Sequence, residues 1–169
     1  GMTMIPPHFF ESSGIKGIAL PDTVTAIGDS AFYGCEEMTE ITLPAACTTL
    51  GTQALYGCKA LETIDLASVR TIGDSAFLLC DALAEFRVAE DNPVFTLVSG
   101  TLVDKQQGIA LRLPGKETTT TVTLPSYVTS VAPYAFAECT TLLAVNLPDT
   151  LFEIGTYAFY GCTSLSSVK

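Results

Sequence analysis

The feature that most limits how this chain can fold is a unit that returns every 22 or 23 residues. Each clear copy has an Ala-Phe or Ala-Leu pair, then a cysteine, then apolar residues three and six positions after it. The cysteines that mark these copies are Cys35, Cys58, Cys80, Cys139 and Cys162. A fixed period of roughly 20 to 30 residues is typical of a solenoid, in which each repeat forms one coil stacked on the previous one.

A single coil of this kind is not expected to fold alone. Ordering about 23 residues has an entropic cost that roughly six apolar positions do not offset. Stacking covers both sides of each apolar layer and pairs each strand with its neighbours in the stack. The sequence therefore predicts a repeat solenoid.

Within a coil, the alternation in Ile41-Thr42-Leu43 predicts a short strand, which the following proline ends. A second extended piece is expected at 24–27 and again at 128–131. Between the two, Asp29 or Ser30 is expected to cap one helical turn that Gly34 closes.

The chain is expected to form one domain, 1–169, in four parts. Residues 1–21 are a degenerate first repeat, 22–89 hold regular repeats, and 122–169 hold two more. Residues 90–121 break the period, and the apolar runs 95–103 and 109–113, joined by 104–108, predict a β-hairpin in one long coil. The last strand stops at Lys169, which predicts an open edge. Either the sequence is a piece of a longer repeat array or another chain covers this edge, for example by self-association.

Charge and hydropathy exclude several classes of partner. The formal net charge is −10 and the eight basic residues form no stripe, so we expect no nucleic-acid binding. No apolar run approaches the roughly 20 residues that span a bilayer. Gly1 before Met2 is typical of a cleaved tag, so we expect a natural leader to lie outside this sequence.

Five of the six cysteines share one repeat position, and only Cys47 is out of phase. An even count in a secreted chain suggests disulfides, but a residue that recurs at one repeat position serves the repeat, most simply as a small buried thiol. The only histidine, His8, lies in the least regular copy and is expected at the surface. With no metal spacing and no phosphate loop, we expect no cofactor, no metal and no enzyme activity.

Outward-facing strand residues are the candidate site. In each strand the apolar residues point inward and the alternate residues point outward. The strip proposed to bind a partner is Glu40, Thr42, Thr63, Asp65, Glu85, Arg87, Thr121, Thr123 and Asn146. Plain solvation of the sheet is the alternative.

Two further candidates lie off the sheet. The hairpin tip 104–108 projects from a regular wall. The tyrosines Tyr33, Tyr56, Tyr134, Tyr157 and Tyr160 either contact a partner or pack between coils.

The motif Leu-Pro-x-x-[Val/Leu]-x-x-Ile-Gly-x-x-Ala-Phe-x-x-Cys-x-x-Leu-x-x-Ile-x-Leu-Pro resembles the leucine-rich repeat of BspA-like, or Treponema-type, proteins over nearly the whole chain. Departures are Leu55 for Phe, Ala132-Pro133 for the Gly step, and Ala67 and Ala89 for the strand-ending Pro. The resemblance implies a curved right-handed solenoid with a parallel sheet on its concave side. It also implies bacterial surface or secreted proteins that act in adhesion or host-protein binding, with no catalytic residues.

We therefore expect a leucine-rich-repeat binding module, extracellular or at the cell surface, that engages a protein or glycan, including one from a host. The competing hypothesis is a structural spacer that displays another domain and has no ligand of its own.

Overall fold

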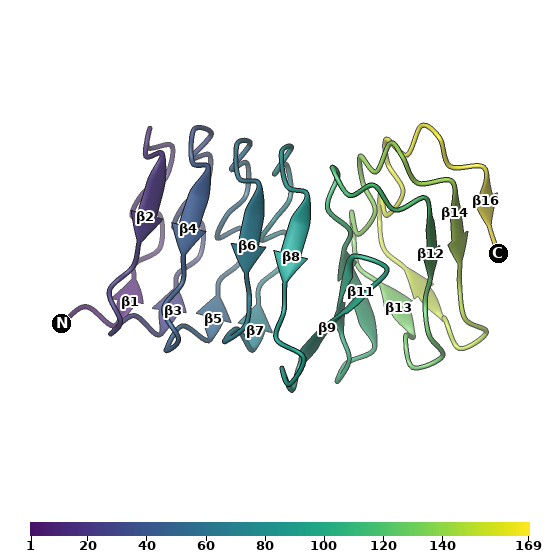
Figure 1. Ribbon diagram of the computed structural model, residues 1–169, viewed down its shortest axis with the longest axis horizontal. Helices are drawn as coiled ribbons and strands as arrows, with labels where there is room; N and C mark the ends of the chain where they lie inside the picture. Colours follow the sequence, from purple (N-terminus) through teal and green to yellow (C-terminus); the bar gives the residue numbers. More distant parts are fainter. The chain divides into compact units, whose positions relative to one another are not determined.

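The computed structural model describes residues 1–169 and consists of short strands and turns, without a helix (Figure 1). It divides into two compact units. The N-terminal unit is Gly1–Leu83 with Arg87–Asn92, and the C-terminal unit is Ala84–Phe86 with Pro93–Lys169. The single domain expected from the sequence stays a prediction.

The N-terminal unit stacks coils that each contribute two short strands. The two-residue strands β1 (Met4–Ile5), β3 (Ala26–Ile27), β5 (Thr49–Leu50) and β7 (Thr71–Ile72) form one parallel sheet in that order. Ile5 lies opposite Ile27, and Leu50 opposite Ile72. The strand within residues 1–21 is therefore in register with the next coil, and the assignment of these residues to a degenerate first repeat stays a prediction.

The three-residue strands lie on another side of the same coils. They are β2 (Gly17–Ala19), β4 (Glu40–Thr42) and β6 (Thr63–Asp65), and β8 (Glu85–Arg87) contributes residues to both units. β2 and β4 pair in parallel, with Ile18 opposite Ile41. Ile41 and Ile64 are buried at the centres of β4 and β6, as the alternation predicted.

The C-terminal unit repeats this plan around an insertion. Strands β12 (Thr121–Thr123), β14 (Ala144–Asn146) and β16 (Ser167–Val168) form a parallel sheet. A second sheet has the order β15 (Glu153–Ile154), β13 (Ser130–Val131), β11 (Ile109–Arg112), β10 (Thr101–Asp104) and β9 (Phe95–Val98). Val122, Val145 and Phe136 belong to the core that fills the space between the sheets.

The predicted hairpin is present, but it is one half of a three-stranded meander. β10 pairs antiparallel with β11 and also with β9, so the run 95–103 is two strands and not one. Ser99 and Gly100 both have positive φ, 48° and 77°, as the central residues of a tight type I′ hairpin turn require. β11 then pairs in parallel with β13, which returns the chain to the regular stack.

The prediction of a helical turn between the two strands of a coil is wrong. Between the two strands of a coil, the N–H groups of Ala31, Tyr33 and Cys35 donate to carbonyls three residues earlier. The intervening N–H groups of Ser30, Phe32 and Gly34 donate instead to the next coil, at 2.7 to 2.9 Å. In a helix all of these N–H groups would donate to carbonyls of the same coil, whereas here every second N–H group donates to the neighbouring coil.

The predicted caps also act between coils. Asp29 does not cap its own turn, because its Oδ1 accepts the backbone N–H of Thr52 in the next coil at 2.8 Å. Ser30 has a φ of 53° and Gly34 a φ of 66°, so the chain enters the left-handed region twice per coil. The expected role of Gly34 at the end of the turn is confirmed.

The apolar interior is arranged in columns. Phe10 stacks on Phe32 with ring centroids 5.0 Å apart, and Phe136 stacks on Phe159 at 5.2 Å. Each pair comes from adjacent coils of one unit. The alignment of these rings within each unit supports the stacked-coil account on which the sequence interpretation rests.

Candidate interaction surface

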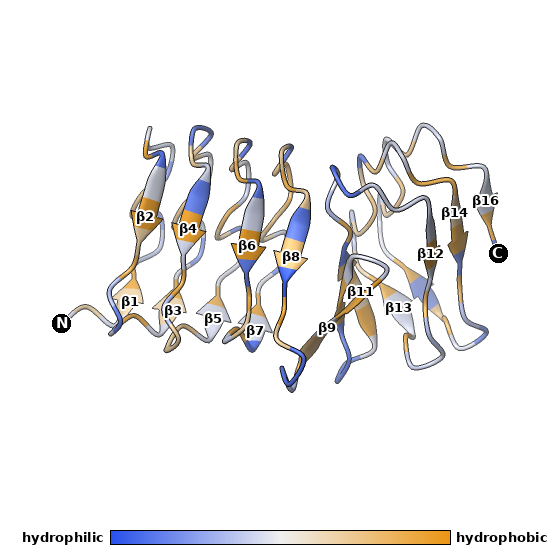
Figure 2. Ribbon diagram, in the orientation of Figure 1, coloured by the Kyte–Doolittle hydropathy of each residue, from blue (hydrophilic) through white to orange (hydrophobic).

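In the N-terminal unit, outward-facing residues of the strip flank the buried isoleucines of two strands. Glu40 and Thr42 are exposed on either side of Ile41, while Asp65 is exposed and Thr63 half-buried beside Ile64. Figure 2 shows the change from hydrophobic to hydrophilic along β6. Arg87 also belongs to this unit and is exposed.

In the C-terminal unit, the strip residues lie on β8, β12 and β14. Glu85, Thr121 and Thr123 are exposed. Asn146 is half-buried, and its Nδ2 donates to Thr123 Oγ1 at 2.9 Å. The structure thus places predicted strip residues on solvent-facing strand surfaces in each unit, and their binding of a partner stays a prediction.

The tyrosines form contacts between coils. Tyr33 stacks on Tyr56 with parallel rings 4.7 Å apart, and Tyr134 stacks on Tyr157 at 5.4 Å. Tyr157 also meets Tyr160 edge to face. Packing between coils, one of the two expected roles, therefore holds for Tyr33 with Tyr56 and for Tyr134 with Tyr157, whereas Tyr157 and Tyr160 belong to one coil.

The hairpin tip is built around one buried carboxylate. Asp104 is 5% exposed, and its Oδ1 accepts the backbone N–H groups of Gln106 and Gln107 at 2.9 and 2.8 Å. The side chains of Lys105, Gln106 and Gln107 are exposed. The tip is therefore a rigid turn that presents one cation and two amides.

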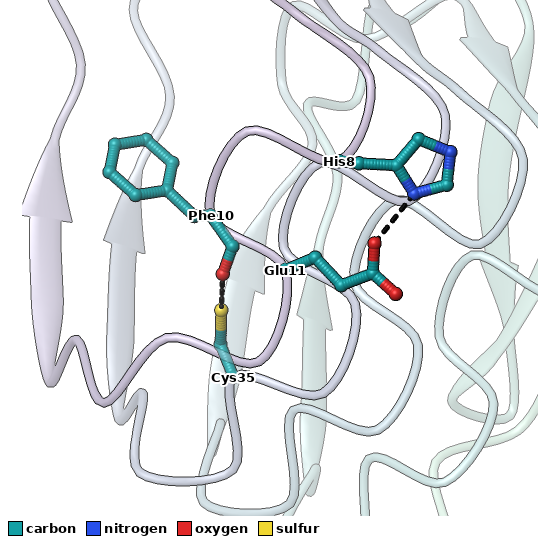
Figure 3. A network of polar contacts seen from close by, with 4 residues as sticks. All are labelled: His8, Phe10, Glu11 and Cys35. Carbon is teal, nitrogen blue, oxygen red and sulfur yellow. Dashed lines mark hydrogen bonds and ion pairs between the residues drawn. The ribbon is translucent and has the colours of Figure 1, made fainter.

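The repeat cysteines form a ladder of thiols, and none of the six cysteines forms a disulfide. Cys35 Sγ donates to the carbonyl of Phe10 at 2.9 Å, in the preceding coil (Figure 3). Cys58 donates to Phe32 at 3.3 Å, and Cys162 to Phe136 at 2.9 Å. The expectation of small buried thiols was thus incomplete, because each of these thiols also hydrogen-bonds the coil before it.

Burial makes these thiols poor nucleophiles. Desolvation raises the pKa of Cys35 and Cys58, and it raises the pKa of Cys139 to about 12 from an ordinary value of 9.0. The thiolate is the reactive form of cysteine, and almost none is present at neutral pH. The ladder is therefore suited to packing and not to chemistry.

His8 lies at the surface, where its Nδ1 contacts Glu11 Oε2 at 2.7 Å (Figure 3). No third group that could complete a catalytic set is hydrogen-bonded to this pair.

No group of three or more His, Cys, Asp and Glu side chains is placed to hold a metal ion. None of the chain's elements is an apolar helix of membrane-spanning length.

Cys47 is in phase with a second column that the sequence analysis missed. Its N–H donates to the carbonyl of Pro44, as Val24 does to Pro21 and Val69 to Leu66. Cys47 and these valines are fully buried after the three-residue strands. The signal was present in the sequence, since Val24, Cys47 and Val69 are 23 and 22 residues apart.

Sequence analysis also missed a small pocket of about 180 Å³ in the N-terminal unit. Asp65, a strip residue, lies on its wall next to Ala67 and Ser68. The rest of the lining includes Leu43, Pro44 and Cys47. This pocket therefore adjoins a predicted strip residue.

The profile of the BspA type leucine rich repeat region matches residues 3–96 and 115–169 in six copies. No curated protein matches this sequence significantly. The unmatched stretch, 97–114, contains most of the meander described above.

Solved structures similar to this chain are bacterial leucine-rich-repeat proteins. A leucine rich cell surface protein from Faecalibacterium prausnitzii is 28% identical in sequence, with a TM-score of 0.89. The aligned region covers 99% of this chain and 45% of the chain of that protein. The pneumococcal vaccine antigen PcpA is 26% identical, with a TM-score of 0.89, and the aligned region covers 99% of this chain and 42% of the PcpA chain. The leucine rich repeat protein of T. pallidum, 21% identical with a TM-score of 0.56, covers 97% of this chain and 72% of its own and shows the fold alone. The chain spans less than half the length of the first two.

Proposed function

Since this chain belongs to the BspA-type leucine-rich-repeat family, we propose that it is a non-catalytic binding module of a bacterial cell-surface or secreted protein. It engages a protein or glycan, including one from a host, through the outward residues of its three-residue strands. This family and its fold are generally non-catalytic, and two of the similar structures are a cell surface protein and a vaccine antigen.

The observation that carries the proposal is the contrast between the buried and the exposed residues of the three-residue strands. The buried residue of each strand is apolar, whereas the exposed residues vary in charge and size, as in Thr42, Asp65 and Arg87. A rigid stack that keeps its interior constant and varies its surface is suited to recognising an extended partner.

The test uses purified host extracellular proteins and a glycan array, both probed with this chain. The triple variant Glu40→Lys, Asp65→Lys and Glu85→Lys should weaken any specific interaction about tenfold or more, because it reverses three charges among the candidate contact residues.

The matched control is Asp22→Lys, Glu37→Lys and Glu90→Lys, which changes the net charge equally at exposed positions outside the strands. Equal weakening by both triple variants would assign the effect to overall charge and reject the strip. Absence of any specific partner on both panels would favour the spacer.

A further inference from the structure

The period of the stack shortens from 23 to 22 residues at one identifiable place. Thr42 ends β4 and Asp65 ends β6, and Cys47 and Val69 occupy the same buried column after them. Five positions separate Thr42 from Cys47, but only four separate Asp65 from Val69. The coil that contains β6 therefore lacks one residue in the loop after its strand.

The comparison of the two loops identifies the missing residue as a proline. The first loop reads Leu43-Pro44-Ala45-Ala46-Cys47 and the second reads Leu66-Ala67-Ser68-Val69. The N–H groups of Cys47 and Val69 donate to the carbonyls three residues earlier, so Ala45 corresponds to Ala67 and Ala46 to Ser68. With Leu43 aligned to Leu66, the residue left without a counterpart is Pro44. Ala67 is thus better described as following a deleted proline than as replacing one.

A pocket of about 180 Å³ lies at this position. Its lining comes from the two loops and is made of Leu43, Pro44, Ala45, Cys47, Asp65, Ala67, Ser68 and Val69. Strands β4 and β6 lie side by side here, yet they belong to separate sheets (Figure 1). Drug-sized ligands usually occupy about 300 to 1,000 Å³, so this pocket fits a single side chain.

Six of the eight lining residues are apolar, and Asp65 contributes the only carboxylate. Asp65 Oδ1 accepts the backbone N–H of Ala67 at 2.9 Å, and its Oδ2 has no partner within the chain. Ser68 adds a half-buried hydroxyl. A side chain with an aliphatic stem and a cationic end would contact the apolar residues with its stem and the carboxylate with its charge.

The loop that forms one wall is held firmly from behind. Asn92 Nδ2 donates to the carbonyls of Leu66, Ala67 and Val69 at 3.3, 3.3 and 3.0 Å. Arg70 Nη1 donates to those of Ala67 and Val69 at 3.0 and 2.9 Å. The Arg70 guanidinium thus binds backbone carbonyls, and Arg70 is not part of the pocket lining. Asp65 is the only charged residue of the lining.

The charge of the N-terminal unit favours a cation at this position. The unit has twelve Asp and Glu and four Lys and Arg residues, a net charge of −8. We propose that the pocket receives the side chain of a lysine from a partner protein, with its methylenes between Pro44 and Ala67 and its ammonium on Asp65. This inference rests on the proposed binding function and names the partner chemistry at one point of the strip.

The probes are a capped Gly-Ser-Lys-Ser-Gly peptide and its norleucine counterpart, which keeps the aliphatic stem and lacks the ammonium. Binding is followed by the amide NMR shifts of Cys47, Ala67, Ser68 and Val69. The lysine peptide should shift these amides and bind about two- to fivefold more tightly than the norleucine peptide, the size expected of an exposed charge pair. Asp65→Asn should abolish the difference, because the amide oxygen still accepts from Ala67 but carries no charge.

A second variant inserts a proline between Leu66 and Ala67, which makes this loop match Leu43-Pro44-Ala45-Ala46-Cys47 and restores the longer period. It should keep the amide spectrum of β3 and β5 and lose the response to the lysine peptide. Equal binding of both peptides, or an undiminished response in the insertion variant, would overturn the proposal. So would a response to butylammonium without one to the lysine peptide, since the pocket would then hold a free amine.

The two levels of inference fail separately. If the lysine peptide leaves these amides unchanged while the triple charge reversal still weakens a partner, the pocket proposal is wrong and the binding surface stands.

Discussion

Two glycines of the N-terminal unit should respond very differently to the same substitution. A Cβ added at Gly73 would lie 2.3 Å from Thr52 N, 2.5 Å from Gly51 C and 2.7 Å from Thr52 Cα. All three are backbone atoms of the previous coil. A Cβ at Gly57 would have Gly34 Cα as its nearest neighbour, at an ordinary 3.6 Å. We expect Gly73→Ala to separate two coils and Gly57→Ala to leave them in place.

The expected free energies of unfolding follow from these contacts. Overpacking usually costs about 1–3 kcal/mol, and three rigid backbone clashes place Gly73→Ala at about 3 kcal/mol or more. Gly57 has a φ of 71°, a conformation that costs an alanine about 1–2 kcal/mol. The stiffer unfolded chain returns about 0.4–1 kcal/mol of that, so Gly57→Ala should cost about 1 kcal/mol.

Urea denaturation followed by circular dichroism measures both variants on the same scale. Amide hydrogen exchange adds a local readout, because Gly51 N–H donates to Ile27 and Gly73 N–H to Leu50 in the preceding coils. Gly73→Ala should speed exchange at Gly73 much more than Gly57→Ala does. A cost for Gly73→Ala no larger than that for Gly57→Ala would refute the claim that this glycine permits the close approach of coils.

Three further predictions concern single residues. Asn92→Ala removes three hydrogen bonds made by a buried amide and should lower the free energy of unfolding, measured by urea titration, by about 2–4 kcal/mol. A loss under about 1 kcal/mol would contradict this prediction. The pKa of Cys139 is raised to about 12, so its stabilising effect is complete below pH 9 and is lost as pH rises towards 12. Cys139→Ala should therefore flatten the alkaline fall in thermal stability between pH 8 and 11, and an unchanged slope would reject this. Leu79 has a φ of 58° and is 41% exposed, so Leu79→Gly should be neutral or stabilising by up to about 1 kcal/mol in thermal unfolding, and a loss above 1 kcal/mol would count against strain there.

The strands were predictable because each obeys a local rule. Ile41 and Ile64 recur at the centre of a period-2 pattern, and burial of that residue follows from the alternation alone. The register of the stack was predictable for a related reason. A shift of one residue would expose every such isoleucine, so the equal spacing of the copies determines which residues lie opposite each other.

The turns were not predictable because their hydrogen bonds are not local. Asp29-Ser30-Ala31-Phe32 has the composition of a capped helical turn, yet every second N–H donates to another coil. Propensity describes a segment in isolation, and here stacking overrides it. Asn92 shows the same limit, since it occupies the Val24 and Val69 column but satisfies its amide on carbonyls of the preceding coil.

Function is difficult to derive from a repeat because the regular positions serve the stack. Phe32 and Cys35 recur for packing reasons, so their recurrence carries no information about a ligand. Positions where the period changes are different, because an extra or missing residue weakens the regular packing and needs another cause to persist. The meander at 95–112 and the shortened loop at 65–69 are two such places, and the second forms a pocket beside a strip residue. In a solenoid, irregular spacing is therefore a better guide to a candidate site than the repeated motif, and restoring the missing proline tests this reasoning directly.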